Sequence, residues 1–245
     1  MPVSFENYTH SFLLNRKHIF APSERGRRIG EDVKQRVESA VSFEDYYYHL
    51  RKGGHVAALH SHRANAHFCK IDIKNFFYSV ERNRVVRALR RIDVHRATHY
   101  GKWSCVRNPF GDPKYALPYG FVQSPILATL VLATSEIGRT LRLMASDVTV
   151  AVYVDDISLS SSDPVRLNAR YDELLDAVDA AGFTVNAGKC VAPCSDMTVF
   201  NCSLRSGETV VTSDRAAEFH MFPPSPESLA GFERYCASVE RGNTK

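Results

Sequence analysis

Two adjacent carboxylates between two apolar runs are the feature of this chain with the clearest capacity for chemistry. Asp155 and Asp156 lie inside the segment VTVAVYVDDISLS, residues 148–160. Neighbouring like charges in a compact fold repel each other unless solvent, a basic side chain or a metal ion offsets them. An exposed turn is the commoner explanation of an isolated Asp-Asp pair, because aspartate is favoured in turns. The interpretation therefore depends on whether other acidic residues converge on this pair.

The residues around the pair predict the element that presents it. Val148, Val150 and Val152 alternate with more polar or smaller residues, and the alternation resumes at Ile157. A period of two residues is typical of a half-buried strand. The pattern predicts a β-hairpin with the two aspartates at its tip.

A second segment brings a third carboxylate to the end of a strand. In FCKIDIKNFFYSV, residues 68–80, Ile71 and Ile73 alternate with Asp72, which would leave the strand on the opposite face. Carboxylate oxygens on neighbouring strands are hard ligands suited to Mg²⁺. Two such ions can activate an attacking hydroxyl and stabilise the leaving oxygen of an in-line displacement. This arrangement indicates nucleotidyl transfer.

Three segments, in order, resemble the palm motifs A, B and C of reverse transcriptases, the RNA-directed DNA polymerases. They are IDIKNFFYSV at 71–80, LPYGFVQSP at 117–125 and YVDD at 153–156. Each motif alone would be weak evidence, but their order is specific. The resemblance covers residues 46–204 and points to prokaryotic retron or defence-associated members. It implies an α+β fold, a right-hand polymerase palm and fingers with an antiparallel sheet, with the thumb reduced or absent.

The resemblance also implies roles for particular residues. Two Mg²⁺ ions, with Mn²⁺ as a substitute, would be held by Asp72, Ile73, Asp155 and Asp156. The catalytic set would be Asp72, Asp155, Asp156 and Lys189, the lysine protonating pyrophosphate. Contacts to the nucleotide would come from Arg51, Lys52, Arg63, Phe77, Gly120 and Gln123.

Several of these assignments have a structural alternative. Lys189 is equally explained as a surface lysine. Phe77 would exclude a ribose 2′-hydroxyl, although Phe76 and Phe77 could both be core residues. Tyr119 stands where the family usually has glutamine, which leaves the orientation of the nucleotide open.

Composition excludes several classes of protein. The chain has 245 residues, 44% of them hydrophobic and 24% charged, so it can bury a core and is not disordered. It has no apolar run of about 18 residues and no signal-peptide pattern, from which we expect no membrane association and a cytoplasmic location. Six dispersed cysteines fit thiols in a reducing compartment better than a disulfide framework.

Basic residues gather in two stretches of a chain whose net charge is only +4. One stretch lies near the N-terminus. The other follows motif A and comprises Arg82, Arg84, Arg87, Arg90, Arg91 and Arg96. Such clusters can neutralise phosphates, but a solvated helix face explains them equally well.

The remaining pattern predicts four consecutive segments. These are a basic helical segment at 1–45, a fingers hairpin at 46–71, the palm with motifs A to E at 72–204, and a primer-grip remainder with a vestigial helix at 205–245. Within them we expect strands at 44–50 and 55–62, short strands at 198–204 and 209–212, and helices at 30–40, 81–93, 124–144, 165–181 and 226–240.

The sequence after 213 has room for one convincing helix, whereas a polymerase thumb is a helical bundle. We therefore expect weak, distributive extension unless a protein partner, a second copy or a structured RNA completes the channel. The partners implied are an RNA template, such as a dedicated non-coding RNA, the DNA product and deoxynucleotides. The alternatives are a template-independent or RNA-synthesising polymerase on the same palm, and a non-catalytic RNA-binding scaffold.

Overall fold

The computed structural model describes residues 7–15 and 17–244. The chain divides into two compact units that are discontinuous in sequence. The first contains residues 1–44 and 74–139, and the second contains residues 45–73 and 140–245. The boundaries of the four contiguous segments expected from the sequence therefore do not coincide with those of the compact units.

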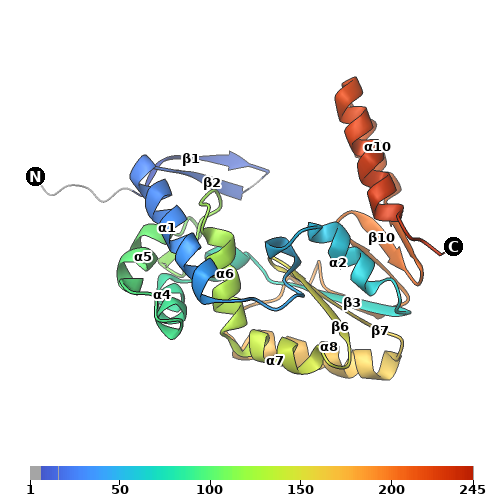
Figure 1. Cartoon of the computed structure of the whole chain (residues 1–245), viewed down its shortest axis with the longest axis horizontal. Coiled ribbons are helices and arrows are strands. Elements are labelled where there is room, and N and C mark those ends of the chain that lie inside the picture. The colour runs from blue at the N-terminus through green and yellow to red at the C-terminus, as the bar shows by residue number, and fades with distance from the viewer. Residues whose placement is uncertain (1–6, 16, 245) are drawn as a thin grey trace, which may run out of the picture. The chain divides into compact units, whose positions relative to one another are not determined.

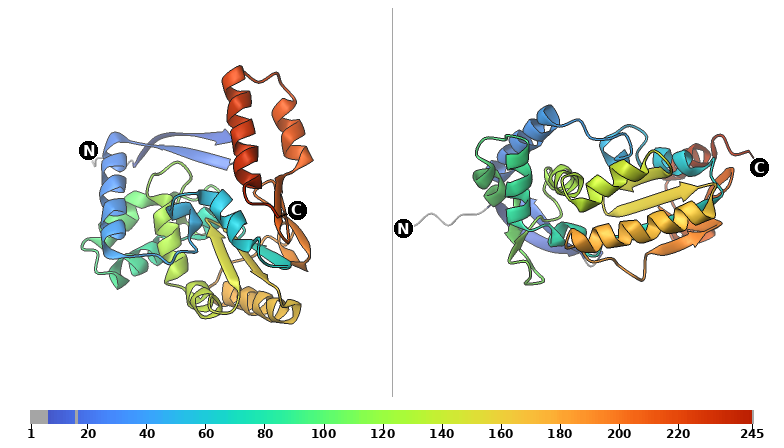
Figure 2. Two further views of the ribbon diagram at one scale, coloured as in Figure 1. Left: turned by 45° about the vertical axis from the view of Figure 1, so that its right-hand side comes forward. Right: turned by 90° about the horizontal axis from the view of Figure 1, so that it is seen from below.

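The second unit is built on a four-stranded antiparallel sheet, with the strand order β6-β7-β3-β8. Its strands are β3 (His67–Asp72), β6 (Thr149–Tyr153), β7 (Asp156–Ser161) and β8 (Val191–Cys194). Helix α2 (Gly54–His62) packs against β6 and β7, and α8 (Pro164–Ala180) packs against β3, β7 and β8. Figure 1 shows these two helices on opposite sides of the strands, and Figure 2 shows α8 running along the sheet.

A smaller sheet and two helices follow in the same unit. Strands β9 (Asp196–Val199), β10 (Cys202–Arg205) and β11 (Glu208–Val211) pair in the order β11-β10-β9. Helices α9 (Ser213–His220) and α10 (Pro226–Glu240) come next, and α10 packs on β11 and α2. One apolar cluster joins the two sheets, and it includes Phe68, Met197, Leu204 and Val239. Burial of these side chains stabilises the smaller sheet against the larger one.

The first unit is mainly helical. Its elements are β1 (Tyr8–Leu14), β2 (Lys17–Pro22), α1 (Glu24–Ala40), α3 (Phe76–Ser79), α4 (Arg82–Arg91), α5 (Ala97–Ser104), β4 (Val106–Arg107), β5 (Tyr115–Ala116) and α6 (Ser124–Ala133). Helix α6 is buried on every side, and α1 and α4 pack against it. Helix α7 (Glu136–Met144) carries the chain from the first unit into the second.

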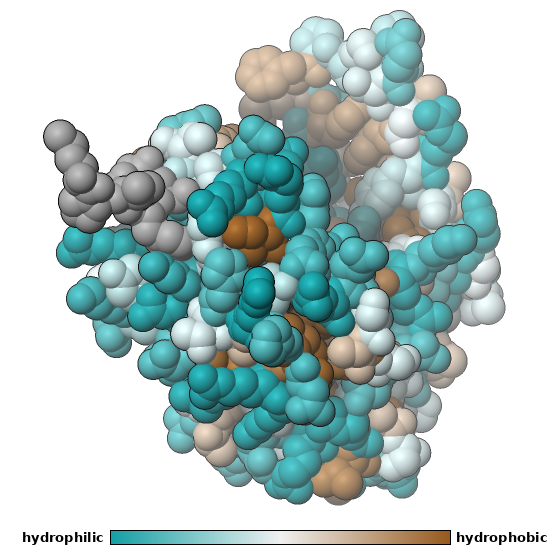
Figure 3. Space-filling view, turned by 60° about the vertical axis from the view of Figure 1, so that its left-hand side comes forward, coloured by the Kyte–Doolittle hydropathy of each residue, from teal (hydrophilic) through white to brown (hydrophobic). Residues whose placement is uncertain are grey.

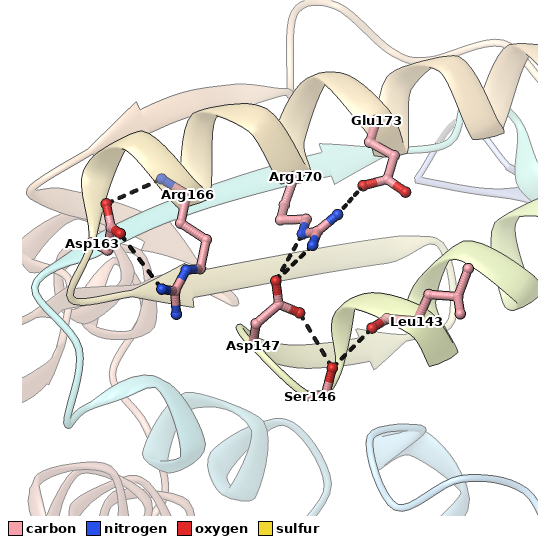
Figure 4. Close-up of polar contacts among 7 residues, drawn as sticks. All are labelled: Leu143, Ser146, Asp147, Asp163, Arg166, Arg170 and Glu173. Atoms are coloured by element: carbon pink, nitrogen blue, oxygen red, sulfur yellow. Dashed lines mark hydrogen bonds and ion pairs between the residues drawn. The ribbon is translucent and has the colours of Figure 1, made fainter.

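An ion-pair network holds the turn between α7 and β6 against α8 (Figure 4). Arg170 donates through Nε and Nη2 to Asp147, at 3.0 and 2.7 Å, and through Nη1 to Glu173. Asp163 caps the N-terminus of α8 by accepting from the backbone of Val165 and Arg166. The network fixes the start of β6, the strand that leads to the acidic turn.

The predicted strand at 55–62 is wrong, and with it the fingers hairpin. These residues form α2, and residues 48–50 form a short 3₁₀ helix, η1 (Tyr48–Leu50). Ala58, Leu59 and His62 are buried on one face, a spacing that suits a helix and not a strand, in which residues 58 and 59 would point to opposite faces.

The other helices and strands differ less from expectation. The predicted helix at 124–144 is two helices, α6 and α7. The hydroxyls of Thr134 and Ser135 donate back to the carbonyls of Leu130 and Leu132, and these bonds cap the end of α6. Helix α1 begins six residues earlier than expected, β1 and β2 form an unpredicted hairpin, and α5 and α9 were not foreseen. The helix at 226–240 and the strands around the acid pair are confirmed.

Candidate active site

The strand register gathers the three predicted carboxylates in the second unit. Strands β3 and β7 are antiparallel partners, and Asp72 is directly opposite Asp156. Beyond this pair, the Ile73 amide donates to the Asp155 carbonyl at 3.2 Å. Side chains of directly opposed residues lie on the same face of a sheet, about 4.5–5.5 Å apart at Cβ. Residues 83 positions apart in the sequence, Asp72 and Asp155, are therefore neighbours at the end of one β-ladder.

Two lysines supply part of the countercharge. Lys189 Nζ lies 3.5 Å from Asp72 Oδ2, and Lys70 Nζ lies 3.8 Å from Asp156 Oδ1. The pKa of Asp156 is raised to about 6, chiefly by burial. The charges of Asp155 and Asp72 act in the same direction, whereas Lys70 and Lys189 oppose the change. Three carboxylates face two lysines here, so a further cation would offset the remaining negative charge.

The donor set fits a hard divalent cation. Carboxylate oxygens from Asp72, Asp155 and Asp156 are the ligands that Mg²⁺ prefers. Ile73 is buried and apolar, so a metal contact from this residue would have to use its carbonyl oxygen. Among the described residues no group of three side chains is already arranged as a ligand cluster. Both lysines contact carboxylates in this structure, and binding of a cation would require these contacts to loosen.

The turn between β6 and β7 has an unusual backbone. Val154, just before the acid pair, has φ +60°, a left-handed conformation that β-branched residues rarely adopt. Its amide donates to His49 Nδ1 at 3.1 Å, and the Val152 amide donates to the Tyr46 carbonyl at 2.8 Å. The segment before α2 therefore holds the acidic turn through main-chain donors.

His49 must be neutral to do this. An amide N–H is an obligatory donor, so Nδ1 accepts and the ring proton lies on Nε2. Burial lowers the pKa of His49 to about 4, which keeps Nδ1 unprotonated at neutral pH. The contact with the turn is thus compatible with the protonation state that burial imposes.

A buried histidine, His62, fixes strand β7. His62 of α2 is 1% exposed, and its Nδ1 and Nε2 lie 2.7 and 2.9 Å from the hydroxyls of Ser160 and Ser158. Asn65 donates to Ser160 as well, at 2.8 Å, and to Thr149 of β6 at 2.9 Å. These contacts satisfy polar groups on the face of the sheet under α2 and position the strand that carries Asp156.

Lys189 lies where the resemblance predicts a general acid. Its loop follows α8 and is attached to the site, because the Asn186 amide donates to the Asp72 carbonyl at 2.8 Å. The side chain of Lys189 is 63% exposed and reaches Asp72. An exposed ammonium beside the carboxylates is able to donate a proton to a departing group, although the role itself stays a prediction.

Three predicted phosphate-binding residues lie in the second unit, and one of them makes structural contacts. Arg63 donates to the carbonyls of Arg241 and Val239 at 2.6 and 2.9 Å and to the Thr209 hydroxyl at 2.7 Å. It therefore anchors the end of α10, and its role as a nucleotide contact stays a prediction. Arg51 bonds the Asp45 carbonyl and Lys52 is exposed, and their role at the triphosphate stays a prediction.

The other three predicted nucleotide contacts lie in the first unit. Phe77 is 7% exposed and meets the Tyr119 ring edge to face, with centroids 4.8 Å apart. Gly120 has φ +100°, and a Cβ there would lie 2.3 Å from the Phe20 carbonyl oxygen, so the chain needs glycine at this position.

Gln123 is buried between helices of the first unit. It is 1% exposed, and its Nε2 donates to the Ser104 hydroxyl at 3.3 Å. Its side chain also fills the space beside Gly30, where a Cβ would lie 2.2 Å from Gln123 Oε1. Gln123 therefore joins α6 to α1 and α5, and its role at the nucleotide stays a prediction.

Sequence reasoning missed Lys70, His49 and His62. Lys70 could have been found, because it precedes Asp72 by two residues and so shares its face of the strand. No sequence pattern marks the two histidines, whose partners lie about a hundred residues away.

An antiparallel sheet with carboxylates at the ends of two adjacent strands and helices on both faces has the form of a polymerase palm. The family model described as "Reverse transcriptase (RNA-dependent DNA polymerase)" matches residues 15–217. The chain belongs to the reverse transcriptase family.

Particular relatives agree with this assignment. Retron Ec73 reverse transcriptase of Escherichia coli is 27% identical over 154 residues, which are 59% of this chain and 49% of the relative. The chain thus spans about half the length of this relative.

Solved structures show the same fold at low identity. The foamy viral protease-reverse transcriptase in complex with double-stranded DNA has a TM-score of 0.54 and 14% identity, over 90% of this chain and 33% of that one. Apo telomerase from Candida tropicalis has a TM-score of 0.57 and 12% identity, over 86% of this chain and 44% of that one. Across residues 7–15 and 17–244, no helix is both long and apolar enough to span a bilayer.

Proposed function

We propose that this chain catalyses RNA-directed DNA synthesis, joining deoxynucleotides to a 3′-hydroxyl by nucleotidyl transfer. The observation that carries the proposal is the register that sets Asp72 opposite Asp156 and beside Asp155. Membership of the reverse transcriptase family supports the choice of template and product.

The metal centre would be formed by the three aspartates. Asp72 and Asp155 would hold Mg²⁺, or Mn²⁺ in its place, with Asp156 supporting them. Two bound ions would lower the pKa of the attacking hydroxyl and offset charge on the phosphates. The chain's own part is to fix the carboxylates: the β3–β7 ladder sets their spacing, and His49 and His62 hold the turn and strand that carry two of them.

Other residues would act on the nucleotide. Lys189, beside Asp72, would donate a proton to the departing pyrophosphate, which leaves more readily once its charge is reduced. Phe77 would place its ring where a ribose 2′-hydroxyl would clash. Arg51 and Lys52 would contact the triphosphate.

Incorporation assays with matched nucleotides test this function against its alternatives. The purified chain is given a primer on an RNA template and labelled dNTP or rNTP, and the assay is repeated without template. We expect template-dependent incorporation of dNTP. Incorporation of rNTP alone, or without template, would favour the alternative polymerases, and no incorporation with intact RNA binding would favour a scaffold.

Substitution of Phe77 tests the choice of sugar. Phe77→Ala should raise the ratio of rNTP to dNTP incorporation by about 10-fold or more, because it removes the steric barrier to the 2′-hydroxyl. Phe76→Leu alters a buried neighbour and serves as the control. Equal ratios in Phe77→Ala and wild type would remove Phe77 from this role.

We further propose a role in a bacterial retroelement or antiviral defence system, with a non-coding RNA as template. The support is the similarity to a retron reverse transcriptase. Sequencing of the nucleic acid that copurifies from cells tests it: a single structured RNA joined to or paired with its DNA copy is expected. Random cellular RNA would contradict the proposal.

A further inference from the structure

Helices α4 and α5 of the first unit enclose a strongly basic groove with a cavity of 580 Å³. Four of its lining residues are cationic, and they are Arg82, Arg87, Arg90 and Lys102. None of its lining residues is acidic. Figure 3 turns this side of the molecule toward the viewer, and hydrophilic side chains dominate the face.

The amphipathic sequence of α4 produces this groove. Val85, Ala88 and Leu89 are buried, whereas Arg82, Arg87 and Arg90 follow the other side of the helix within an arc of about 140°, at ~3.6 residues per turn. Helix α5 approaches closely because position 101 is glycine: a Cβ there would lie 2.5 Å from Val86 Cγ2. The close contact forms the floor of the groove.

The positive charge of the groove is only partly compensated. Arg87 pairs with Glu81 at 3.5 Å, but this pair is exposed, and such pairs contribute little. Arg90 donates to the neutral hydroxyl of Thr98 at 3.2 Å. Arg82 lies over the Tyr115 ring, 4.5 Å from its centroid. The positive potential therefore stays available to an anionic ligand.

The basic surface continues in both directions. A second cavity, of 390 Å³, shares Arg90 and Thr98 with the groove and adds His95, Arg96 and one acidic residue, Asp93. At the other end, Lys114 lies 5.8 Å from the Tyr115 ring, so this ring has two cations close to it. Arg82 and Arg90 alone are separated by about 12 Å along the helix, at ~1.5 Å per residue. A single phosphate can contact only a small part of such a surface, whereas the successive phosphates of a nucleic-acid backbone can contact its whole length.

We propose that the groove between α4 and α5 binds the phosphate backbone of a nucleic acid, as a contact separate from the three carboxylates of the second unit. Arginine suits this role because its planar guanidinium bonds two phosphate oxygens at once. Tyr115 offers an aromatic face at the end of the row. The inference rests on the proposed function only in requiring that this chain binds a nucleic acid. It does not depend on the catalytic assignment, because the groove contains no residue of the palm motifs.

Binding measurements on a catalytically blocked chain test the groove apart from the polymerase activity. In an Asp155→Asn background, Arg82, Arg87 and Arg90 are changed together to Gln, and Arg139, Arg142 and Arg166 are changed to Gln as the matched control, since all three are exposed. Fluorescence anisotropy gives Kd for a labelled RNA hairpin, a DNA hairpin of the same sequence and polyglutamate, over a range of KCl concentrations.

The groove variant should bind the hairpins more weakly, and the slope of log Kd against log salt should fall by about 2, at ~0.7–0.9 for each phosphate that the variant no longer neutralises. Weaker binding of both hairpins identifies the shared backbone, and weaker binding of RNA alone identifies RNA as the ligand. Equal weakening in the groove and control variants, an unchanged slope, or an effect confined to polyglutamate would overturn the proposal. Circular dichroism confirms that both variants are folded.

Discussion

Val154 adopts a backbone conformation that its own side chain disfavours, next to two residues on which the proposed chemistry depends. Backbone conformations of this kind cost about 1–3 kcal/mol and persist when the surroundings impose them. The Val154 amide donates to His49 Nδ1, and the amide of Val152, two residues earlier in the chain, donates to the Tyr46 carbonyl. We interpret His49 as a positioning residue of the acidic turn.

A double-mutant cycle tests this interpretation. His49→Ala should lower kcat for dNTP incorporation by about 10-fold, with KM for dNTP changing less, because the turn loses its acceptor. In a Val154→Asn background the same change should cost less than about 3-fold, since asparagine tolerates the left-handed conformation. His60→Ala removes a different imidazole as control. Equal effects of His49→Ala in both backgrounds would contradict the interpretation.

At the level of single residues, the sequence predicted which carboxylates lie together but not which side chains hold them in place. The order of motifs and the two-residue alternation identified Asp72, Asp155 and Asp156, and the structure places them together. The contacts of Arg63 with the end of α10 and of Gln123 with Ser104 were not predicted, because only the fold brings these partners near. Long-range hydrogen bonds leave no periodic signal in a sequence.

Among the elements, strand β7 has buried polar side chains on the face that α2 covers. Ser158 and Ser160 are buried at positions where apolar side chains would normally pack, and His62 bonds both. Burial lowers the pKa of His62 to about 4, below its ordinary value of 6.5. The folded state therefore favours the neutral ring, and stability that is present above pH 6.5 falls as the pH drops toward 4.

The pH dependence of unfolding measures this contribution. Between pH 7.5 and pH 5 we expect the wild-type free energy of unfolding to fall by about 2 kcal/mol through His62 alone. His62→Gln should reduce this fall by a similar amount while lowering stability at pH 7.5, and the exposed His220→Gln should leave it unchanged. Urea unfolding at the two pH values gives the comparison. Parallel pH profiles for wild type and His62→Gln would show that His62 does not titrate on unfolding.

Some helices and strands could be predicted from the period of their apolar residues, and others could not. Long or strongly alternating segments, such as α10 and the β6–β7 hairpin, match their prediction. The short segment at 55–62 does not, because eight residues of mixed polarity fit either period and the tertiary contacts of α2 decide. Strand β1 has mostly exposed side chains, so the β1–β2 hairpin lacks the apolar alternation that would reveal it.

At the scale of the whole molecule, the chain passes between its two compact units three times. Sequence composition changes little at these crossings, so contiguous segments were the natural expectation. The second unit contains the carboxylates, Lys70 and Lys189, and the first contains Phe77, Gly120 and the basic groove. The family model covers parts of both units, since it matches residues 15–217.

The most direct test of the proposed function is single-nucleotide incorporation on an RNA template by wild type and Asp155→Asn. The exchange preserves the shape of the side chain but removes its charge, so the variant should keep its circular dichroism spectrum and thermal unfolding temperature. We expect Asp155→Asn to lose at least about 10³-fold in rate, because one carboxylate of the proposed metal centre is gone. Asp163→Asn, at the N-terminus of α8, should retain activity. Normal incorporation by Asp155→Asn, with the Mg²⁺ dependence of wild type, would show that these carboxylates do not form the catalytic site.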